Sequence, residues 1–406
     1  MNSLYKLKSI VCLLSFLSVS HCRNDELDVI KTYSPSQNAV YALIYYTLPG
    51  VLATSSGGVS GGNTGLPRGF KSSGSSLFAV GSSSSLYEST DGNTFTKKTF
   101  TIPNCTVVNG SSSGASYTEC NIVSVAKSGS TIYAIGIKQS GVRGATSSAT
   151  SVTEHKFYFA SGATVNDLNF TEISDSNFST SIFQASNILP SAASSNGFVF
   201  GFGVSSSSHK YCGTANNGSS WVCQTGVASV SSPGLVELLN GTLVADIYFR
   251  WNGTGFTNAV TSNQGTKGSA IYSSGRTIYN SGNTIRYTTT DPSAWSGSSI
   301  AGEATATQTG GASSSYNWIG DFSGTLKAFG TSFSNNVNTF TAHTSSDNGT
   351  NWSNQGTISL PGSLSPSNNV GSINNTVFVY GQSNSGTFTQ KYFKSTDFTN
   401  WTEVVP

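Results

Sequence analysis

A short hairpin signature recurs seven times along this chain and constrains its fold more than any other feature. The fullest copy, residues 345–352, reads Ser-Ser-Asp-Asn-Gly-Thr-Asn-Trp: a small hydroxyl residue, an acid, a turn glycine and a closing aromatic. In such a turn an Asp or Asn side chain accepts hydrogen bonds from backbone N–H groups just ahead of it, and Gly or Asn supplies the positive φ that closes the hairpin. The aromatic ring anchors the returning strand in apolar surface. The signature therefore predicts a structural turn and not a catalytic group.

Six further copies vary this pattern. Three keep the Asp four residues ahead of the aromatic, two carry Asn in its place, and residues 161–170 form a degenerate copy. The residues assigned to these structural turns are Asp91, Phe95, Asn216, Trp221, Asn252, Phe256, Asp291, Trp295, Asp347, Gly349, Trp352, Asp397 and Trp401. The spacing of the closing aromatics is that of a repeat in which each unit is one small sheet.

The signature resembles the Asp-box, or BNR, repeat (Ser-x-Asp-x-Gly-x-Thr-Trp) of sialidases and many other β-propellers. The copy at 345–352 comes nearest to the full pattern, with Asn351 in place of the family's Thr. The repeat is structural in that family, so the resemblance implies a fold and not an activity. Four short strands can be traced in the clearest repeat, at 369–373, 376–381, 388–394 and 402–405. We therefore predict an all-β, seven-bladed propeller of four-stranded antiparallel blades; six blades, with 161–170 as an insertion, is the alternative.

Composition favours an exported all-β protein over a disordered chain. Only 9% of the residues are charged, against roughly 25% in an average soluble domain. The chain holds 44 glycines and is rich in serine, which is also typical of low-complexity tracts. However, 36% hydrophobic and 11% aromatic residues, in short runs, are enough to fill a core.

The N-terminus predicts export and lipid attachment. Residues 1–21 combine two lysines with the short apolar stretch 10–19, too short to span a bilayer, and read as a signal peptide that ends before Cys22. The ending resembles a bacterial lipobox, similar to the looser ones of spirochaete lipoproteins, in which the Cys carries the lipid. His21 is an unusual residue there, and an ordinary signal peptide beside a chance Cys is the alternative. We predict three parts: 1–21, signal peptide; 22–65, a lipid-anchored tether with either a short helix or a strand; and 66–406, the propeller.

Charge narrows the choice of partner. Residues 1–21 carry two lysines and no acid, so the processed chain has 18 basic and 18 acidic side chains. Without a basic run, nucleic acid is not expected as a partner. Membrane attachment would rest on the N-terminal lipid. We expect a monomer in the cell envelope, on the outer membrane or cell surface.

The four cysteines beyond Cys22 predict two disulfides. Cys212 and Cys223 lie nearly symmetrically about the turn at 217–218, which suits a cross-strand bridge. Cys105 and Cys120 flank a Ser/Gly-rich loop whose closure would remove roughly 3 kcal/mol of unfolded-state entropy. No histidine lies at ligand spacing from either pair, so no metal and no cofactor are predicted.

Strand alternation assigns the loops to two faces of the ring. If each signature lies between third and fourth strands, it shares a face with the turn between first and second strands. The connections at 101–121, 138–154, 173–186, 296–315 and 357–368 would then emerge on the other face. That elaborated face is where function is usually carried on a rigid scaffold; unconstrained loop growth is the alternative.

Catalytic residues are poorly marked. The sialidases that the signature resembles need three clustered arginines, a Tyr–Glu nucleophile pair and an Asp, whereas this chain has six arginines in all. Arg250 and Arg286 fall in third strands, away from the central channel. Arg68, Glu237 and Asp321 are the candidate channel-lining residues, and the two carboxylates are read first as structural. We predict a non-enzymatic binding or adhesion module for a glycan or a host or envelope protein. A sialidase-like glycoside hydrolase and an envelope assembly scaffold are the alternatives.

Overall fold

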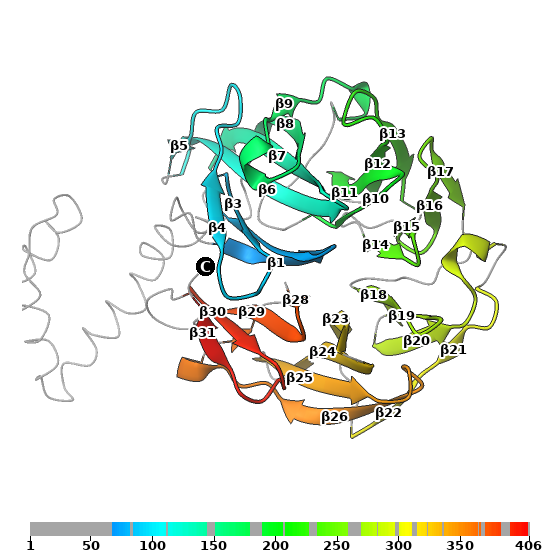
Figure 1. The fold of residues 1–406 in the computed structure, drawn as a ribbon. Coiled ribbons are helices and arrows are strands. Elements are labelled where there is room, and N and C mark those ends of the chain that lie inside the picture. Colours follow the sequence, from blue (N-terminus) through cyan, green and yellow to red (C-terminus); the bar gives the residue numbers. More distant parts are fainter. Residues whose placement is uncertain are drawn as a thin grey trace, which may run out of the picture. The chain divides into compact units, whose positions relative to one another are not determined.

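The structure, a computed structural model, is a seven-bladed β-propeller (Figure 1). Seven antiparallel sheets follow one another around a ring, each built from consecutive strands of the chain. The prediction of seven four-stranded blades is confirmed, and the degenerate copy at 161–170 belongs to a blade of its own. The residues described are 67–81, 84–110, 113–143, 151–178, 189–205, 208–226, 234–258, 269–281, 283–296, 300–310, 315–322, 324–334, 337–363, 365–366, 370–382 and 390–404. The predicted signal peptide, Cys22 and the tether lie outside them.

Each blade contributes four strands in chain order, the first nearest the centre of the ring (Figure 1). Blade 1 comprises β1 (Pro67–Ser73), β2 (Ser76–Gly81), β3 (Ser85–Ser89) and β4 (Thr96–Thr99). Blade 2 comprises β6 (Ser116–Ser128), β7 (Thr131–Val142), β8 (Ser151–Gly162) and β9 (Thr171–Glu172). Blade 3 comprises β10 (Ser191–Ser194), β11 (Gly197–Ser205), β12 (Ser208–Thr214) and β13 (Val222–Thr225). Blade 4 comprises β14 (Val236–Leu239), β15 (Thr242–Ala245), β16 (Phe249–Trp251) and β17 (Phe256–Asn258). Blade 5 comprises β18 (Ala270–Ser273), β19 (Arg276–Ser281), β20 (Thr284–Thr288) and β21 (Ala304–Thr305). Blade 6 comprises β23 (Ser315–Phe322), β24 (Thr325–Ser334), β25 (Val337–Ser345) and β26 (Asn351–Thr357). Blade 7 comprises β28 (Gly371–Ile373), β29 (Thr376–Gln382), β30 (Gln390–Ser395) and β31 (Thr402–Val404).

Three short strands extend this pattern. β5 (Val108–Asn109) pairs with β6, β27 (Ser365–Pro366) pairs with β29, and β22 (Thr307–Thr309) runs parallel to β26 at the outer edge of blade 6. The helical turns of the described residues are 3-10 turns of three residues each: η5 (Val165–Asp167), η6 (Ser176–Phe178), η7 (Pro292–Ala294) and η8 (Pro361–Ser363). In the described part of the chain no helix is long and apolar enough to cross a membrane.

A separate hydrophobic cluster fills each of the seven interfaces between neighbouring blades. Because each blade is covered on both faces, its second strand is apolar on both: Leu77 and Ala79 of β2 pack toward blade 7, while Phe78 and Val80 pack toward blade 2. This two-sided burial follows from the alternation of side chains along a strand. The short apolar runs of the sequence are thus the middle layers of a radial stack.

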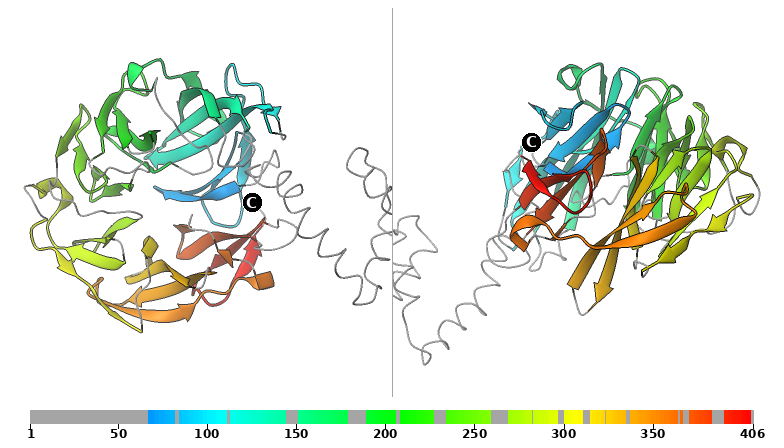
Figure 2. Two further views of the ribbon diagram at one scale, coloured as in Figure 1. Left: turned by 180° about the vertical axis from the view of Figure 1, so that it is seen from behind. Right: turned by 60° about the horizontal axis from the view of Figure 1, so that its bottom comes forward.

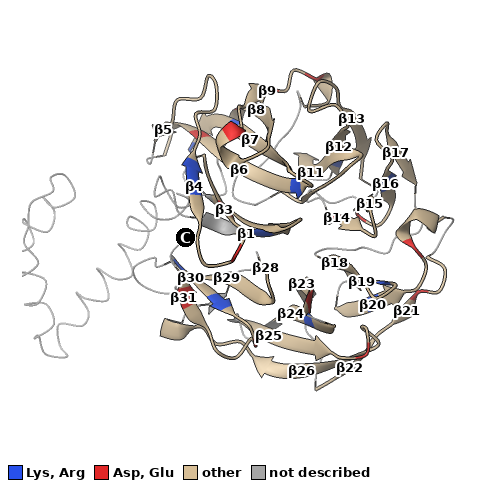
Figure 3. Ribbon diagram, in the orientation of Figure 1, with Lys and Arg blue, Asp and Glu red and all other residues tan. Residues whose placement is uncertain are grey.

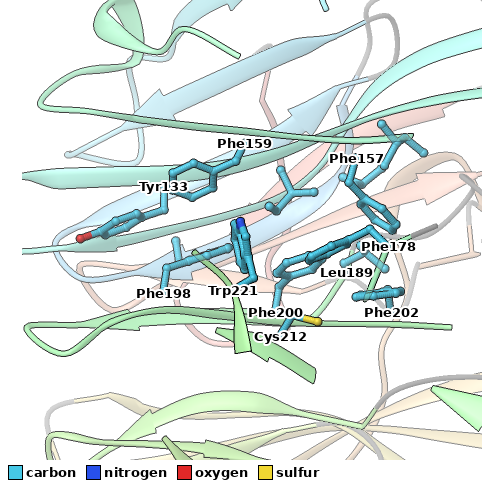
Figure 4. Packing of buried hydrophobic residues seen from close by; sticks show 14 of the residues in the cluster. Tyr133, Phe157, Phe159, Phe178, Leu189, Phe198, Phe200, Phe202, Cys212 and Trp221 are labelled. Atoms are coloured by element: carbon cyan, nitrogen blue, oxygen red, sulfur yellow. The ribbon is translucent and has the colours of Figure 1, made fainter. Parts of the chain in front are cut away.

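The cluster between blades 2 and 3 shows how aromatic rings fill these interfaces (Figure 4). Phe198, Phe200 and Phe202 project from one face of β11, and the ring centroids of Phe200 and Phe202 are 5.4 Å apart. Trp221, which closes a signature turn, meets Phe200 edge-on with a centroid separation of 5.7 Å. Such offset and edge-on pairs add to the stabilisation from buried area alone.

The seven signature turns all connect the third strand of a blade to the fourth, as predicted. In blade 6 the Ser345 hydroxyl donates to Asp347 Oδ1 (2.8 Å) and accepts from the Gly349 N–H (3.0 Å), while the Asn351 N–H donates to Asp347 Oδ1 (2.9 Å). The same arrangement recurs around Asp91 and Asp397, and with Asn216 in place of Asp. Hydroxyl and carboxylate together satisfy the N–H groups that the tight turn leaves unpaired.

Each closing aromatic packs into the interface with the preceding blade. Trp352 of blade 6 lies in the cluster shared with blade 5, and Phe170 of the degenerate copy lies in the cluster between blades 1 and 2. The turn itself also approaches the preceding blade: a Cβ on Gly349, whose φ is +85°, would lie 2.9 Å from Ile278 Cγ1. Glycine is required there by both the backbone and the neighbour.

Serine hydroxyls join neighbouring blades near the centre of the ring. Ser191 donates to Val125 O across blades 2 and 3 (3.0 Å), Ser73 accepts from the Lys127 N–H across blades 1 and 2 (2.8 Å), and Ser269 accepts from the Ile319 N–H across blades 5 and 6 (3.1 Å). A small hydroxyl lets the first strands approach closely while satisfying backbone groups at their unpaired edges. The high serine content of the chain therefore has a structural use.

The two faces of the ring differ. The turns between first and second strands lie with the signature turns on one face, here the signature face. On the opposite face, β6, β7 and β8 reach 13, 12 and 12 residues, and β24 and β25 reach 10 and 9, so blades 2 and 6 extend beyond the other blades (Figure 2). In the predicted loop at 138–154, residues 138–142 and 151–154 lie in strands, because β7 continues to Val142 and β8 begins at Ser151. The predicted loop at 296–315 likewise contains β21 and β22.

Candidate functional site

The first strands place Lys71 and Glu237 at the same height in the ring. Each lies two residues before the last paired residue of its strand, Ser73 in β1 and Leu239 in β14. Five small or aliphatic residues occupy the corresponding positions of the other blades: Ala126, Ala192, Ile271, Gly320 and Gly371. The two charged side chains are therefore the only ionisable ones at this level among the described first strands.

Lys71 and Glu237 form an ion pair across the ring. Lys71 Nζ lies 3.6 Å from Glu237 Oε1, although blade 1 and blade 4 are separated by two blades in one direction and three in the other. The side chains are 18% and 29% exposed. Figure 3 shows charged residues on β1 and near β14, which face each other across the centre. Burial raises the pKa of Glu237, and the neighbouring Lys71 ammonium acts in the opposite direction.

Asp321, the second predicted carboxylate, lies on β23 of blade 6, in a first strand as expected. It accepts hydrogen bonds from the Ser273 hydroxyl of blade 5 and from the Gly324 N–H (2.9 Å). It thus caps the turn after its own strand and ties two blades together. This is a structural environment for a carboxylate.

The four arginines whose side chains the structure describes do not converge on the centre. Arg143 pairs with Glu119 (2.9 Å), Arg286 pairs with Glu303 (2.8 Å), Arg276 donates to Thr350 Oγ1 (2.7 Å) and Arg250 donates to Ser293 O. Arg250 and Arg286 lie in third strands, as predicted, on β16 and β20. Arg68 lies in the first strand β1, but its side chain is outside the described part of the structure.

The opposite face carries a projection on blade 2, here the blade 2 extension, formed by residues 105–110, 113–120, 138–143 and 151–156. The Arg143 guanidinium stacks on Tyr117 with 4.1 Å to the ring centroid and donates to Gly110 O (3.2 Å). Lys138 pairs with Glu154 (2.9 Å), and Thr118 and Ser140 share a hydrogen bond (2.9 Å). At its edge Val107 and Val108 are 40% and 44% exposed.

The structure contains both predicted disulfides. Cys105–Cys120 ties the connection after blade 1 to β6, with Cα atoms 6.0 Å apart. Cys212 and Cys223 are direct partners in the register of β12 and β13, so that bridge joins neighbouring strands of blade 3. The first disulfide anchors the blade 2 extension, and the second lies within a blade.

Three histidines are buried or half-buried in third strands. His155 stacks on Phe157 with ring centroids 4.9 Å apart. His209 Nε2 lies 3.7 Å from Asp246 Oδ2, and His343 Nε2 shares a hydrogen bond with Thr341 Oγ1 (3.1 Å). Burial lowers the pKa of both His155 and His343 to about 4. Within the described ranges no group of three potential metal ligands occurs.

Sequence reasoning missed Lys71 and the contacts of Arg143. Lys71 had a detectable signal, since it lies three residues before the Gly74 turn, as Glu237 lies three before the turn that begins at Asn240. The contact between them had none, because it joins residues whose blades are not adjacent. The Arg143–Tyr117 stack likewise depends on how far β6 and β7 extend.

Comparison with known proteins shows no family for this chain. No family model matches the chain, and no curated protein sequence matches it. Among solved structures, a Trypanosoma rangeli sialidase in complex with 2,3-difluorosialic acid is 10% identical, with a TM-score of 0.42 over 80% of this chain and 53% of the sialidase. An α-L-arabinofuranosidase from Clostridium thermocellum is 11% identical, with a TM-score of 0.36 over 71% of this chain and 94% of that enzyme. The chain spans about half the length of the sialidase.

Proposed function

We propose that this chain is an exported, lipid-anchored, non-enzymatic binding module, attached to the outer membrane or cell surface through Cys22. Its propeller would present the opposite face, and the blade 2 extension in particular, to a glycan or to a host or envelope protein. On this proposal the signature turns are Asp-boxes in the structural sense of that repeat.

The observation that carries the proposal is the use of the described arginines. Arg143, Arg250, Arg276 and Arg286 each hold a partner within or between blades, and none lies on a first strand. The centre of the ring carries the Lys71–Glu237 pair. A substrate carboxylate held by three arginines would need side chains that this arrangement commits elsewhere.

The blade 2 extension supports the choice of binding face because it is preorganised. Its shape is held in the absence of a ligand by the Cys105–Cys120 disulfide, by two ion pairs and by the stacking of Arg143 on Tyr117. A rigid surface avoids much of the ordering entropy that binding would otherwise cost.

A binding screen of the full chain against glycan arrays and extracellular-matrix proteins tests the proposal. Thr153→Arg places a bulky charge on the exposed part of the extension, and Ser130→Arg places the same charge on the signature face of the same blade. We expect Thr153→Arg to weaken capture at least about ten-fold and Ser130→Arg to leave it unchanged. The reverse ranking would assign binding to the signature face, and no capture of any ligand would favour the scaffold alternative.

Lipid attachment is tested by detergent-phase partitioning of the expressed chain. Cys22→Ala should move the protein to the aqueous phase, whereas Cys12→Ala, inside the predicted signal peptide, should not. A Cys22→Ala protein that stays in the detergent phase would refute the anchor.

A glycoside hydrolase is the second candidate, favoured by one observation. Glu237 lies at the centre of the ring with a raised pKa, as a general acid requires, and Asp321 lies on another first strand. Hydrolysis of aryl glycosides by the purified chain, lost in both Glu237→Gln and Asp321→Asn, would establish it. The contact of Glu237 with Lys71 instead favours the ionised carboxylate and argues for a structural role.

A further inference from the structure

The seam between blade 7 and blade 1 is closed without exchange of a strand. All four strands of blade 1 come from 67–99 and all four of blade 7 from 371–404, so among the described residues each blade is complete by itself. The seam relies on side-chain contacts: the Ser372 N–H donates to Ser72 Oγ (2.6 Å), Lys394 Nζ to Asn93 Oδ1 (2.6 Å) and Asn374 Nδ2 to Thr90 O (3.4 Å). Among the residues that the structure describes, the two ends of the ring are held together by non-covalent contacts.

The described core of the seam is among the smaller ones. Its cluster contains seven buried apolar residues, against eight between blades 4 and 5 and fifteen between blades 2 and 3. Because apolar burial stabilises roughly in proportion to area, the seam should separate more easily than the interface between blades 2 and 3. A second attachment of blade 1 would therefore add to the stability of the closed ring.

Lys71 provides such an attachment. We propose that the Lys71–Glu237 ion pair is a cross-ring tie that holds blade 1 against blade 4 and thereby keeps the seam closed. The tie bypasses the circumference, because it connects the blade at the seam directly to a blade far from it.

The first strands are built to let the two side chains meet. At the same height, blades 2, 3, 6 and 7 carry Ala126, Ala192, Gly320 and Gly371, none of which extends beyond a methyl group. Ala126 and Ala192 are buried in interblade clusters, and a Cβ on Gly320 or Gly371 would meet Trp318 or Leu77, so none of these four residues places a side chain between Lys71 and Glu237. Partial exclusion of water strengthens the attraction between the two charges relative to a pair on the surface.

The test is a double-mutant cycle on the full chain, read by thermal unfolding and by amide hydrogen exchange at one pH. Lys71→Met and Glu237→Gln should each lower Tm by about 2 °C or more. Amide exchange in β1 and β28 should become about ten-fold faster, while exchange in β19 and β20, remote from the seam, stays unchanged. The reversed pair Lys71→Glu/Glu237→Lys should recover most of both losses, because it restores the attraction with the positions exchanged.

Lys156 and Glu172 supply the matched control. They form an ion pair of 2.8 Å within blade 2, with side chains 37% and 35% exposed. Lys156→Met and Glu172→Gln should change neither Tm nor exchange at the seam. The tie is refuted if the Lys71 and Glu237 variants behave like this control pair, if exchange rises equally in all blades, or if the reversed pair is less stable than either single variant.

Discussion

The two ends of the blades differ in how their structure is specified. At the signature face four of the seven turns repeat one hydrogen-bond scheme, and all seven send an aromatic ring into the interface with the preceding blade. At the opposite face each blade is different, and blades 2 and 6 extend beyond the rest. Local side-chain chemistry therefore fixes one end of the propeller, while the other end is free to differ from blade to blade. The following predictions test this contrast.

The largest loss is expected at the signature face, from Trp352→Ala. The indole is fully buried between blades 5 and 6 and donates to Gly349 O (3.0 Å), so its removal leaves a cavity and an unpaired carbonyl. We expect a loss of about 3 to 5 kcal/mol in the free energy of unfolding, measured by denaturant titration. Phe256→Ala, at a half-buried closing aromatic, should cost clearly less; equal losses would contradict anchoring by burial.

At the opposite face the largest effect should come from the Cys105–Cys120 disulfide. Replacing both cysteines by serine frees the connection that anchors the blade 2 extension and should cost up to about 3 kcal/mol on the chain-entropy model. Limited proteolysis should then cleave within residues 105–120 while blades 3 to 7 stay protected. Cleavage spread evenly over all blades would show that the extension is coupled to the whole ring.

The two ends should lose stability in different pH ranges. His155, in the blade 2 extension, has its pKa lowered from 6.5 to about 4, so the unfolded chain binds the proton first and stability falls as the pH drops from 6.5 to 4. Hydrogen bonds from the Thr94 and Asn93 N–H groups lower the pKa of Asp91 in a signature turn from 3.8 to about 2, so its contribution is lost between those values. His155→Gln should flatten the upper range of a stability–pH curve, and Asp91→Asn only the lower.

The smallest expected effect separates the negative charge of Asp347 from its position as a hydrogen-bond acceptor. Asp347→Ala removes an acceptor of the Ser345 hydroxyl and the Asn351 N–H and should cost about 1 kcal/mol. Asp347→Asn should cost less, because Asn216 accepts the equivalent bonds in blade 3. If the Asn variant is as damaged as the Ala variant, the negative charge and not the acceptor geometry stabilises the turn.

In the candidate site, too, some features could be predicted from the sequence and others could not. The sequence placed Glu237 and Asp321 on first strands and Arg250 and Arg286 on third strands, because strand order could be counted from the turns. It could not predict that Glu237 meets Lys71, because that contact crosses the ring between blade 1 and blade 4, which are not neighbours. Nor could it predict the length of β7 and β8, whose residues 138–142 and 151–154 are polar enough to read as loop.

The sequence by itself determined the blades of this protein. Hydroxyl, acid, glycine and aromatic act within ten residues of one another, so each turn, its two flanking strands and both disulfides could be derived from local spacing. Only the tertiary structure decided what happens between blades: which side chains fill each interface, which charges meet at the centre, and how far a hairpin rises above the opposite face. The physical reason is the distance along the chain over which each kind of interaction acts. Turn chemistry acts over a few bonds, whereas these features depend on how seven separately encoded sheets pack into one closed ring.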